Sequence, residues 1–301
     1  MYKELEGYIE NEGHKIFYRA VGNRDGIPVI YVHGGPGGSI SKKSESFFDL
    51  NKYFVILFDQ RGCGKSLPRW KIEGNDTFSL VKDMEKIRTY FNIDKWILFG
   101  GSWGSTLSLV YAINYADRVI SMFLRGIFLG TESEWKWIYE KGSDNFYSEF
   151  FELFENFVPE KYRNNKIAYY YEILKNGTSE QKKEASFLWA NWEYINCTLN
   201  TPKDLSHDFE ANYQISLLES HYAFNNSFLD DNYILNNADS IKDIKIFIFQ
   251  GRYDIICPPK SAFSLSKKMN NCEIFFIKES GHSPFEKNLF LKIKSCLDNF
   301  I

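Results

Sequence analysis

The stretch 98–106, Leu-Phe-Gly-Gly-Ser-Trp-Gly-Ser-Thr, limits the possible folds of this chain more than any other feature. An apolar run at 96–99 comes before it, and apolar residues at helical spacing follow it. This order predicts a strand, a sharp turn at Ser102 and a helix. Gly100 and Gly104 lack the Cβ atoms that would collide where such a turn passes its neighbours. The pattern predicts that the Ser102 hydroxyl stands free beyond the end of a strand, where it can meet a substrate carbonyl.

Short apolar runs of this kind recur along the chain and predict buried strands. Helical patterns separate many of them, for example 79–91 between the second run and the third. Strands that alternate with helices indicate an α/β protein with a mostly parallel central sheet, whose ligands lie at the carboxyl ends of the strands. The predicted strands are 29–32, 54–58, 96–99, 122–124, 246–249 and 274–277.

The character of the sequence changes between residues 130 and 236. Short β-branched runs give way there to long helical patterns that are crowded with aromatic residues. We interpret 130–236 as a helical cap domain inserted into a core domain made of 1–129 and 237–301. We find no internal repeat and no flexible linker.

Composition excludes several classes of function. The chain has 301 residues and a net charge of −3, and no basic stripe indicates a nucleic-acid partner. No uninterrupted apolar stretch predicts a membrane span or a signal peptide. The five cysteines are scattered and form no C-x-x-C pair, which is typical of reduced thiols in a cytoplasmic protein. The oligomeric state leaves no mark in the sequence.

Two further residues complete a catalytic constellation with Ser102. A serine hydroxyl is a weak nucleophile until a base takes its proton. When a G-x-S-x-G turn carries the nucleophile, the acid and then the histidine follow it in the chain. Asp254 follows the run 246–249, and His282 follows the run 274–277. We therefore predict a triad of Ser102, Asp254 and His282, with Asp254 orienting the imidazole.

The negative charge that develops on a substrate oxygen needs backbone N–H donors. We expect one from Trp103, next to the nucleophile, and one from the loop 33–38, most directly from Gly35. That glycine-rich loop lacks the Lys-Ser/Thr ending and the G-x-G-x-x-G spacing of phosphate-binding loops. The histidines show no metal-ligand spacing, so we predict neither a metal nor a cofactor. For 59–62 we expect a structural turn, with Arg61 paired to a nearby acid.

Motifs spread over nearly the whole chain carry a resemblance to one family. With them the chain resembles the proline iminopeptidases, which are serine aminopeptidases of the α/β-hydrolase superfamily. In the core the motifs are His33-Gly34-Gly35-Pro36-Gly37-Gly38, Asp59-Gln60-Arg61-Gly62, Gly100-Gly101-Ser102-Trp103-Gly104-Ser105-Thr106-Leu107, Leu124-Arg125-Gly126-Ile127-Phe128, Gly251-Arg252-Tyr253-Asp254 and Ser280-Gly281-His282-Ser283. In the cap they are Trp189-Ala190-Asn191-Trp192-Glu193 and Glu219-Ser220-His221-Tyr222.

The resemblance implies that the protein releases N-terminal proline from peptides through an acyl-enzyme intermediate. It also implies that Glu193 and Glu219 bind the substrate ammonium and that Phe128 belongs to the proline pocket. A desolvated cation does need carboxylate partners. Without the resemblance, these two glutamates could not be told from solvated carboxylates on helix surfaces.

Two positions depart from the family pattern. Ala223 and Ile138 stand where aromatic residues of the proline pocket are expected. Either Phe224 or a cap tryptophan could fill the space. The hypothesis is an enzyme that prefers proline but tolerates other small N-terminal residues.

Other functions stay open at this point. A carboxylesterase or another serine hydrolase of the same fold would share the triad and have no need of Glu193 and Glu219. A catalytically silent binding module is a third alternative, although such modules usually lose a catalytic residue. An epoxide or haloalkane hydrolase would need aspartate in place of Ser102.

Overall fold

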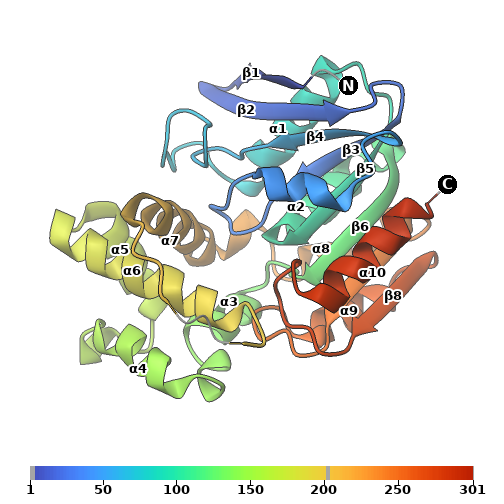
Figure 1. Ribbon diagram of the computed structural model, residues 1–301. Helices are drawn as coiled ribbons and strands as arrows, with labels where there is room; N and C mark the ends of the chain where they lie inside the picture. The colour runs from blue at the N-terminus through green and yellow to red at the C-terminus, as the bar shows by residue number, and fades with distance from the viewer. Residues whose placement is uncertain (1–3, 201–203, 301) are drawn as a thin grey trace.

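The computed structural model describes residues 4–200 and 204–300. At its centre is an eight-stranded sheet in the order β1-β2-β4-β3-β5-β6-β7-β8 (Figure 1). β1 and β2 form an antiparallel hairpin and β2 is antiparallel to β4, whereas the other neighbours are parallel. The strands are β1 (Leu5–Asn11), β2 (His14–Gly22), β3 (Ile27–Val32), β4 (Tyr53–Phe58), β5 (Trp96–Ser102), β6 (Val119–Ile127), β7 (Lys245–Gly251) and β8 (Cys272–Ile277).

Helices cover both faces of this sheet and extend beyond it. The α-helices are α1 (Thr77–Tyr90), α2 (Trp103–Asn114), α3 (Glu132–Tyr139), α4 (Ser148–Asn156), α5 (Lys166–Asn176), α6 (Ser179–Asn196), α7 (Phe209–Phe224), α8 (Tyr233–Asn236), α9 (Pro259–Ser266) and α10 (Lys287–Asp298). None of the helices in the described part of the chain is long and apolar enough to cross a membrane.

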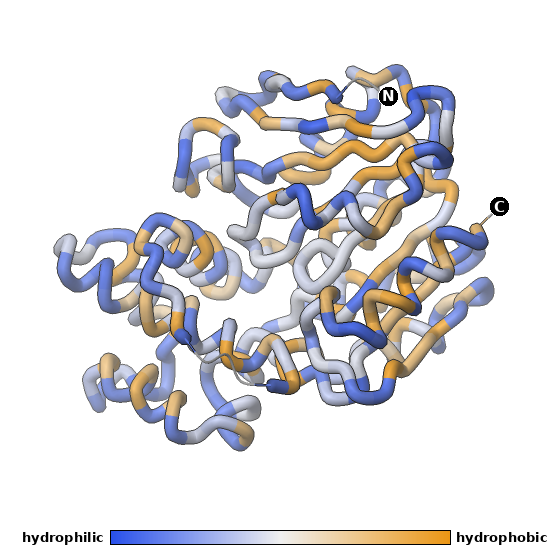
Figure 2. The backbone as a smooth tube through the Cα atoms, viewed as in Figure 1, coloured by the Kyte–Doolittle hydropathy of each residue, from blue (hydrophilic) through white to orange (hydrophobic). Residues whose placement is uncertain are grey.

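The fold buries apolar residues on both faces of the sheet. One cluster packs α1, α2 and α9 against the sheet, and the other packs α10 and the short 3₁₀ helix Lys42–Phe47 against the opposite face. Figure 2 shows the resulting contrast, with hydrophobic central strands and mixed outer helices. β4 is buried along its whole length, as expected for a strand with helices on both sides.

The six predicted strands all lie within observed strands, from β3 to β8. The mostly parallel α/β sheet is therefore confirmed. Helices α3 to α7, residues 132–224, lie together beside the edge of the sheet where its strands end (Figure 1), and we call this segment the cap. α8 packs against α2 instead.

The turn after β4 is structural, as predicted. Nε and Nη2 of Arg61 donate hydrogen bonds of 2.7 and 2.8 Å to the Asp83 carboxylate on α1. Arg61 also donates to the Gly74 carbonyl oxygen at 2.6 Å. Both Arg61 and Asp83 are buried, so each charge depends on the other for compensation.

Candidate active site

Ser102 is the last residue of β5 and directly precedes α2. Its φ of +58° and ψ of −129° are strained values for a residue with a side chain. A Cβ on Gly100 would lie 2.3 Å from the Gly104 carbonyl oxygen, and one on Gly104 would lie 2.2 Å from that of Val32. Only glycine therefore fits on either side of the serine, for the reason expected from the sequence.

Asp254 and His282 meet at the carboxyl ends of β7 and β8. Nδ1 of His282 lies 3.0 Å from Oδ1 and 2.9 Å from Oδ2 of Asp254. Asp254 also accepts hydrogen bonds from the Cys257 N–H at 2.8 Å and from Gln250 Nε2 at 3.2 Å. Both Asp254 and His282 are buried, and these contacts hold the carboxylate beside Nδ1 of the imidazole.

Arg125, at the end of β6, is a site residue whose part the sequence did not reveal. Its Nη1 donates to the His282 carbonyl oxygen at 2.9 Å and lies 3.2 Å from His282 Nε2. A guanidinium can only donate, so Nε2 of His282 is the acceptor, and Nδ1 carries the proton and donates its hydrogen bond to Asp254. No hydrogen bond joins Ser102 to His282 in the described residues. Nε2 of His282 can accept the proton of Ser102 only after its hydrogen bond from Arg125 has been broken.

The side chains of His33 and Gln60 join the loop 33–38 to the turn that carries Ser102. The Gln60 N–H donates to Nε2 of His33 at 3.0 Å, so Nδ1 of His33 carries its proton and donates to the Gly34 carbonyl oxygen at 2.9 Å. Burial lowers the pKa of His33, which keeps this imidazole neutral. Gln60 Nε2 donates to the His33 carbonyl oxygen at 2.8 Å, and the Trp103 indole donates to Gln60 Oε1 at 2.9 Å. The loop is thereby fixed beside the first residue of α2.

One small pocket brings Ser102 together with most of the other predicted site residues. Its free volume is only about 10 Å³, so the lining side chains nearly fill it. Trp103 reaches the site through its main chain, as the first residue of α2. The pocket is lined by Gly35, Ser102, Phe128, Trp135, Ile138, Tyr139, Glu193, Glu219, Ile256 and Cys257.

Glu193 on α6 and Glu219 on α7 supply the negative charge of this pocket. Oε2 of Glu219 accepts hydrogen bonds of 2.8 Å from the Tyr139 hydroxyl and of 2.8 Å from the Trp189 indole. Burial raises the pKa of Glu193, and burial together with the charge of Glu193 raises the pKa of Glu219 well above its usual range. Glu219 is buried and Glu193 is half-buried, and two neighbouring carboxyls in such a setting favour sharing a proton until a cation takes its place.

Aromatic and aliphatic side chains form the rest of the wall. The rings of Phe128 and Trp135 meet edge to face, with centroids 4.8 Å apart. Ile138 lines the pocket, but Ala223 and the half-exposed Phe224 line a separate polar cavity on the other side of Trp135. Trp135 lines both spaces, whereas Phe224 lines only the separate one. Ala223 does not enlarge the pocket beside Ser102.

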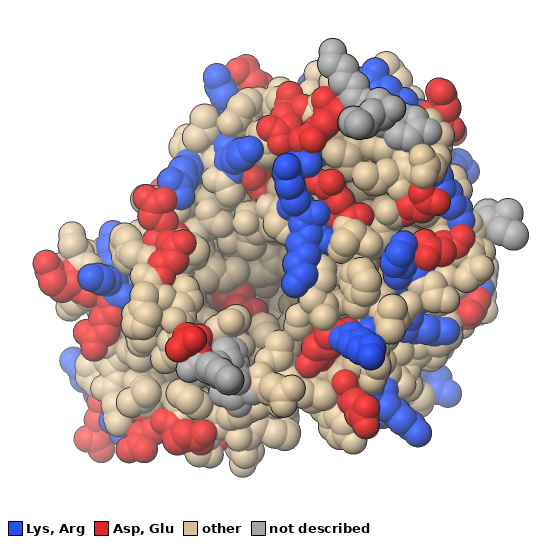
Figure 3. Space-filling model, in the orientation of Figure 1, with Lys and Arg blue, Asp and Glu red and all other residues tan. Residues whose placement is uncertain are grey.

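The pocket continues outward along the cap. Glu193 also lines a wider groove between the loop residues 37–39 and the helices α6 and α7. Figure 3 shows a hollow on this face between the core and the cap, with acidic side chains at its floor. Glu193 thus lines both this groove and the pocket that holds Ser102 and Glu219.

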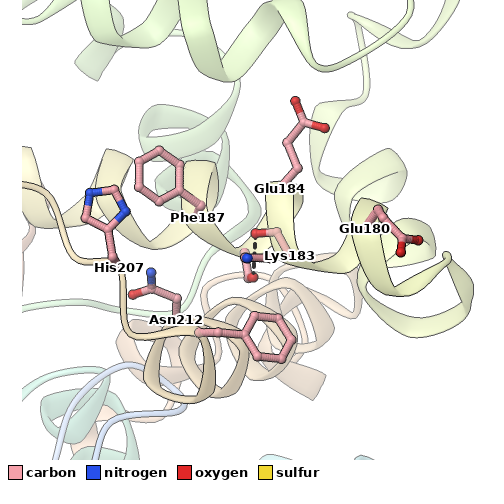
Figure 4. A pocket seen from close by; sticks show the side chains of 8 residues that line it. Glu180, Lys183, Glu184, Phe187, His207 and Asn212 are labelled. Atoms are coloured by element: carbon pink, nitrogen blue, oxygen red, sulfur yellow. Dashed lines mark hydrogen bonds between the residues drawn. The ribbon is translucent and has the colours of Figure 1, made fainter.

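An apolar pocket at the far end of α6 is separate from this site. Phe187 and His207 stack there beside Asn212 (Figure 4), and the pocket shares no lining residue with the one that holds Ser102. Cys257 does line the Ser102 pocket, but burial raises its pKa well above the usual range, so the thiol stays protonated. No group of three or more His, Cys, Asp or Glu residues within 4–200 and 204–300 could hold a metal ion.

Comparisons with known proteins agree with this geometry. Residues 27–289 match the family described as "alpha/beta hydrolase fold". Among solved structures, an alpha/beta fold family hydrolase from Bacillus anthracis str. Sterne covers 98% of this chain and 99% of its own, with a TM-score of 0.62 and 18% identity. The protein therefore has the α/β-hydrolase fold, and a likeness at this identity shows the fold alone.

Two relatives narrow the assignment. The chain is 40% identical to the proline iminopeptidase of Neisseria meningitidis serogroup B over 298 residues, which cover 98% of this chain and 96% of the relative. It is 36% identical to the proline iminopeptidase of Arabidopsis thaliana over 301 residues, which cover 96% and 79% respectively. The chain belongs to the proline iminopeptidase family.

Proposed function

We propose that this protein is a serine aminopeptidase that releases proline from the free N-terminus of a peptide. The observation that carries the proposal is the pairing of Glu193 and Glu219 in one small pocket with Ser102. An esterase needs the serine but has no use for a buried and a half-buried carboxylate beside it. A peptide with a free amine supplies the cation that offsets their cost of burial.

The amine fixes the register of cleavage. A protonated N-terminus that replaces the shared proton of Glu193 and Glu219 sets the first residue of the substrate against the pocket wall that Phe128 and Trp135 form. Only the first peptide bond then reaches Ser102. This arrangement favours aminopeptidase activity over cleavage within a chain.

Acylation follows from the three catalytic residues. Ser102 Oγ attacks the carbonyl carbon of the first residue while Nε2 of His282 takes its proton, and Asp254 stabilises the resulting imidazolium. The N–H groups of Trp103 and Gly35 receive the negative charge on the carbonyl oxygen. His282 then protonates the leaving amine, and the remainder of the peptide departs through the groove.

Deacylation reverses these roles. His282 takes a proton from water, the hydroxide attacks the prolyl ester, and the imidazolium returns the proton to Ser102 Oγ. Proline leaves, and the glutamate pair regains its proton. No step needs a metal or a cofactor.

Two further assignments go with this proposal. We assign 130–236 to a cap domain and 1–129 with 237–301 to the core domain, which is supported by the position of α3 to α7 beside the sheet. We also retain the predicted cytoplasmic location, which is supported by five free cysteines in the described residues.

The test replaces the carboxylates and leaves the triad in place. In a Glu193→Gln/Glu219→Gln variant, hydrolysis of prolyl-β-naphthylamide should fall by at least a hundredfold, because the ammonium loses its partners. Hydrolysis of p-nitrophenyl acetate, which has no amine, should stay within about threefold of the wild type. An equal and small effect on both substrates would favour a carboxylesterase or another serine hydrolase.

A further inference from the structure

The main chain of the catalytic histidine is held by the cap. The N–H groups of His282 and Ser283 donate to the Cys197 carbonyl oxygen at 3.0 and 2.8 Å. Cys197 is the C-cap residue of α6, the helix that carries Glu193 four residues earlier. Glu193, the proposed amine-binding residue, is therefore one helical turn from Cys197. The carbonyl oxygen of Cys197 in turn holds the main chain of His282, the proposed base.

Glu286 reinforces the same junction from the core. Its Oε1 accepts a hydrogen bond from the Leu199 N–H at 2.8 Å, and its Oε2 accepts one from the Gly281 N–H. Gly281 directly precedes His282, and Leu199 lies two residues beyond Cys197. A single carboxylate thus joins the loop of the base to the end of α6 through two charge-assisted hydrogen bonds.

The side chain of Glu286 has no other structural task in the described residues. It occupies the N-cap position of α10 but makes no capping hydrogen bond to that helix. The loop that it holds lies outside strands and helices, so no sheet ladder or helix fixes the position of His282. On the core side, His282 is held by Arg125 and Asp254.

We propose that Glu286 is a positioning residue that locks the His282 loop to the C-terminal end of α6. It keeps a fixed spacing between His282, which activates Ser102, and Glu193, which receives the substrate amine. The part that concerns Glu193 rests on the proposed aminopeptidase function, whereas the effect on His282 does not. Misplacement of a catalytic group by 1 Å costs about a hundredfold in rate, so a small shift of this loop is measurable.

The experiment compares Glu286→Ala and Glu286→Gln with a matched control, Glu279→Gln, which changes an exposed glutamate on the same loop. With prolyl-β-naphthylamide, Glu286→Ala should lower kcat about tenfold or more and leave KM within about twofold. The Glu286→Gln amide oxygen can still accept one of the two hydrogen bonds, so its kcat should lie between those of Glu286→Ala and the wild type. Glu279→Gln should match the wild type.

A second readout needs no amine. The rate at which a fluorophosphonate labels Ser102 depends on the base, and it should fall in Glu286→Ala by a factor similar to that of kcat. A rise in KM at unchanged kcat, or a lower melting temperature with unchanged kinetics and labelling, would overturn the proposal. If the wild type cleaves only esters, the proposed function fails, and the labelling rates still decide the role of Glu286.

Discussion

Gly126, near the end of β6, lies close to the predicted catalytic residues Asp254 and His282. Its φ is +50°, and a Cβ there would stand 3.0 Å from Cε1 and 3.1 Å from Nδ1 of His282, and 3.2 Å from Oδ2 of Asp254. Glycine is needed both for the backbone conformation and for the space that the imidazole occupies.

We predict that Gly126→Ala lowers kcat at least tenfold, because the methyl group displaces His282 from Asp254. It should also lower the free energy of unfolding by about 1 kcal/mol through backbone strain. Gly13→Ala is the matched control, since Gly13 has φ of +77° and nothing within 4 Å of a Cβ. Steady-state kinetics and urea unfolding separate the two effects, and equal kcat values for both variants would contradict the explanation.

The pocket wall makes a prediction about selectivity. Trp135, Ile138 and Phe128 enclose the small space beside Ser102, and the proline ring is compact and rigid. We expect kcat/KM for a prolyl anilide to exceed that for a leucyl anilide at least tenfold, with the alanyl compound between them. Ile138→Ala should narrow the difference by making room. Equal turnover of the prolyl and leucyl anilides in the wild type would contradict the preference for proline.

At this scale, local sequence identifies some site residues and not others. Ser102 could be predicted because its turn requires glycines on both sides, and Asp254 and His282 because they follow strands in a fixed order. The contacts of Arg125 could not be predicted, since it meets a histidine 157 residues away through its side chain. Glu286 was not singled out either, because neither motif nor spacing indicates that its carboxylate turns away from its own helix.

Helices α6 and α7 bring two acidic side chains together, and this proximity affects stability. The pKa of Glu219 is raised well above 4.5, so the folded state holds a proton that the unfolded state has released above that pH. The unfolded state then binds fewer protons than the native state, and this contribution to the free energy of unfolding falls as pH rises.

We therefore predict that Glu219→Gln gains stability relative to the wild type as pH rises from 5 to 8. The difference should grow with pH as long as only the folded wild type holds the proton. Urea unfolding at several pH values measures it, with the exposed Glu184→Gln on α6 as control. A difference that is independent of pH would show that the pair holds no extra proton.

Six of the eight strands of the sheet could be predicted from the sequence. Strands β3 to β8 could be predicted because each is a short apolar run inside a covered sheet. The hairpin of β1 and β2 could not be predicted, since β1 mixes polar residues with apolar ones and only Ile9 of its seven residues is buried at the edge of the sheet. β1 pairs with β2 alone, and β2 pairs in turn with β4.

For the molecule as a whole, the sequence was enough to predict the α/β class, but not how the cap meets the core. Some of the contacts that join them are made by main-chain groups at Cys197 and Leu199 and by the Glu286 carboxylate. Others come from cap side chains: Gln214 Nε2 donates to the Gly37 carbonyl oxygen at 2.8 Å, and the Trp137 indole donates to that of Ile255 at 2.7 Å. Main-chain contacts of this kind leave no pattern in the sequence. They connect the helix that carries Glu193, the proposed amine-binding residue, to the loop of His282, the proposed base.

The most direct test of the account compares prolyl-β-naphthylamide with its N-acetylated counterpart, with Ser102→Ala as control. The account predicts hydrolysis of the free-amine compound at least a hundredfold faster than that of the acetylated one, because only the free amine pairs with Glu193 and Glu219. Ser102→Ala should abolish the activity. Equal hydrolysis of both compounds, or of neither while p-nitrophenyl acetate is turned over, would contradict an aminopeptidase.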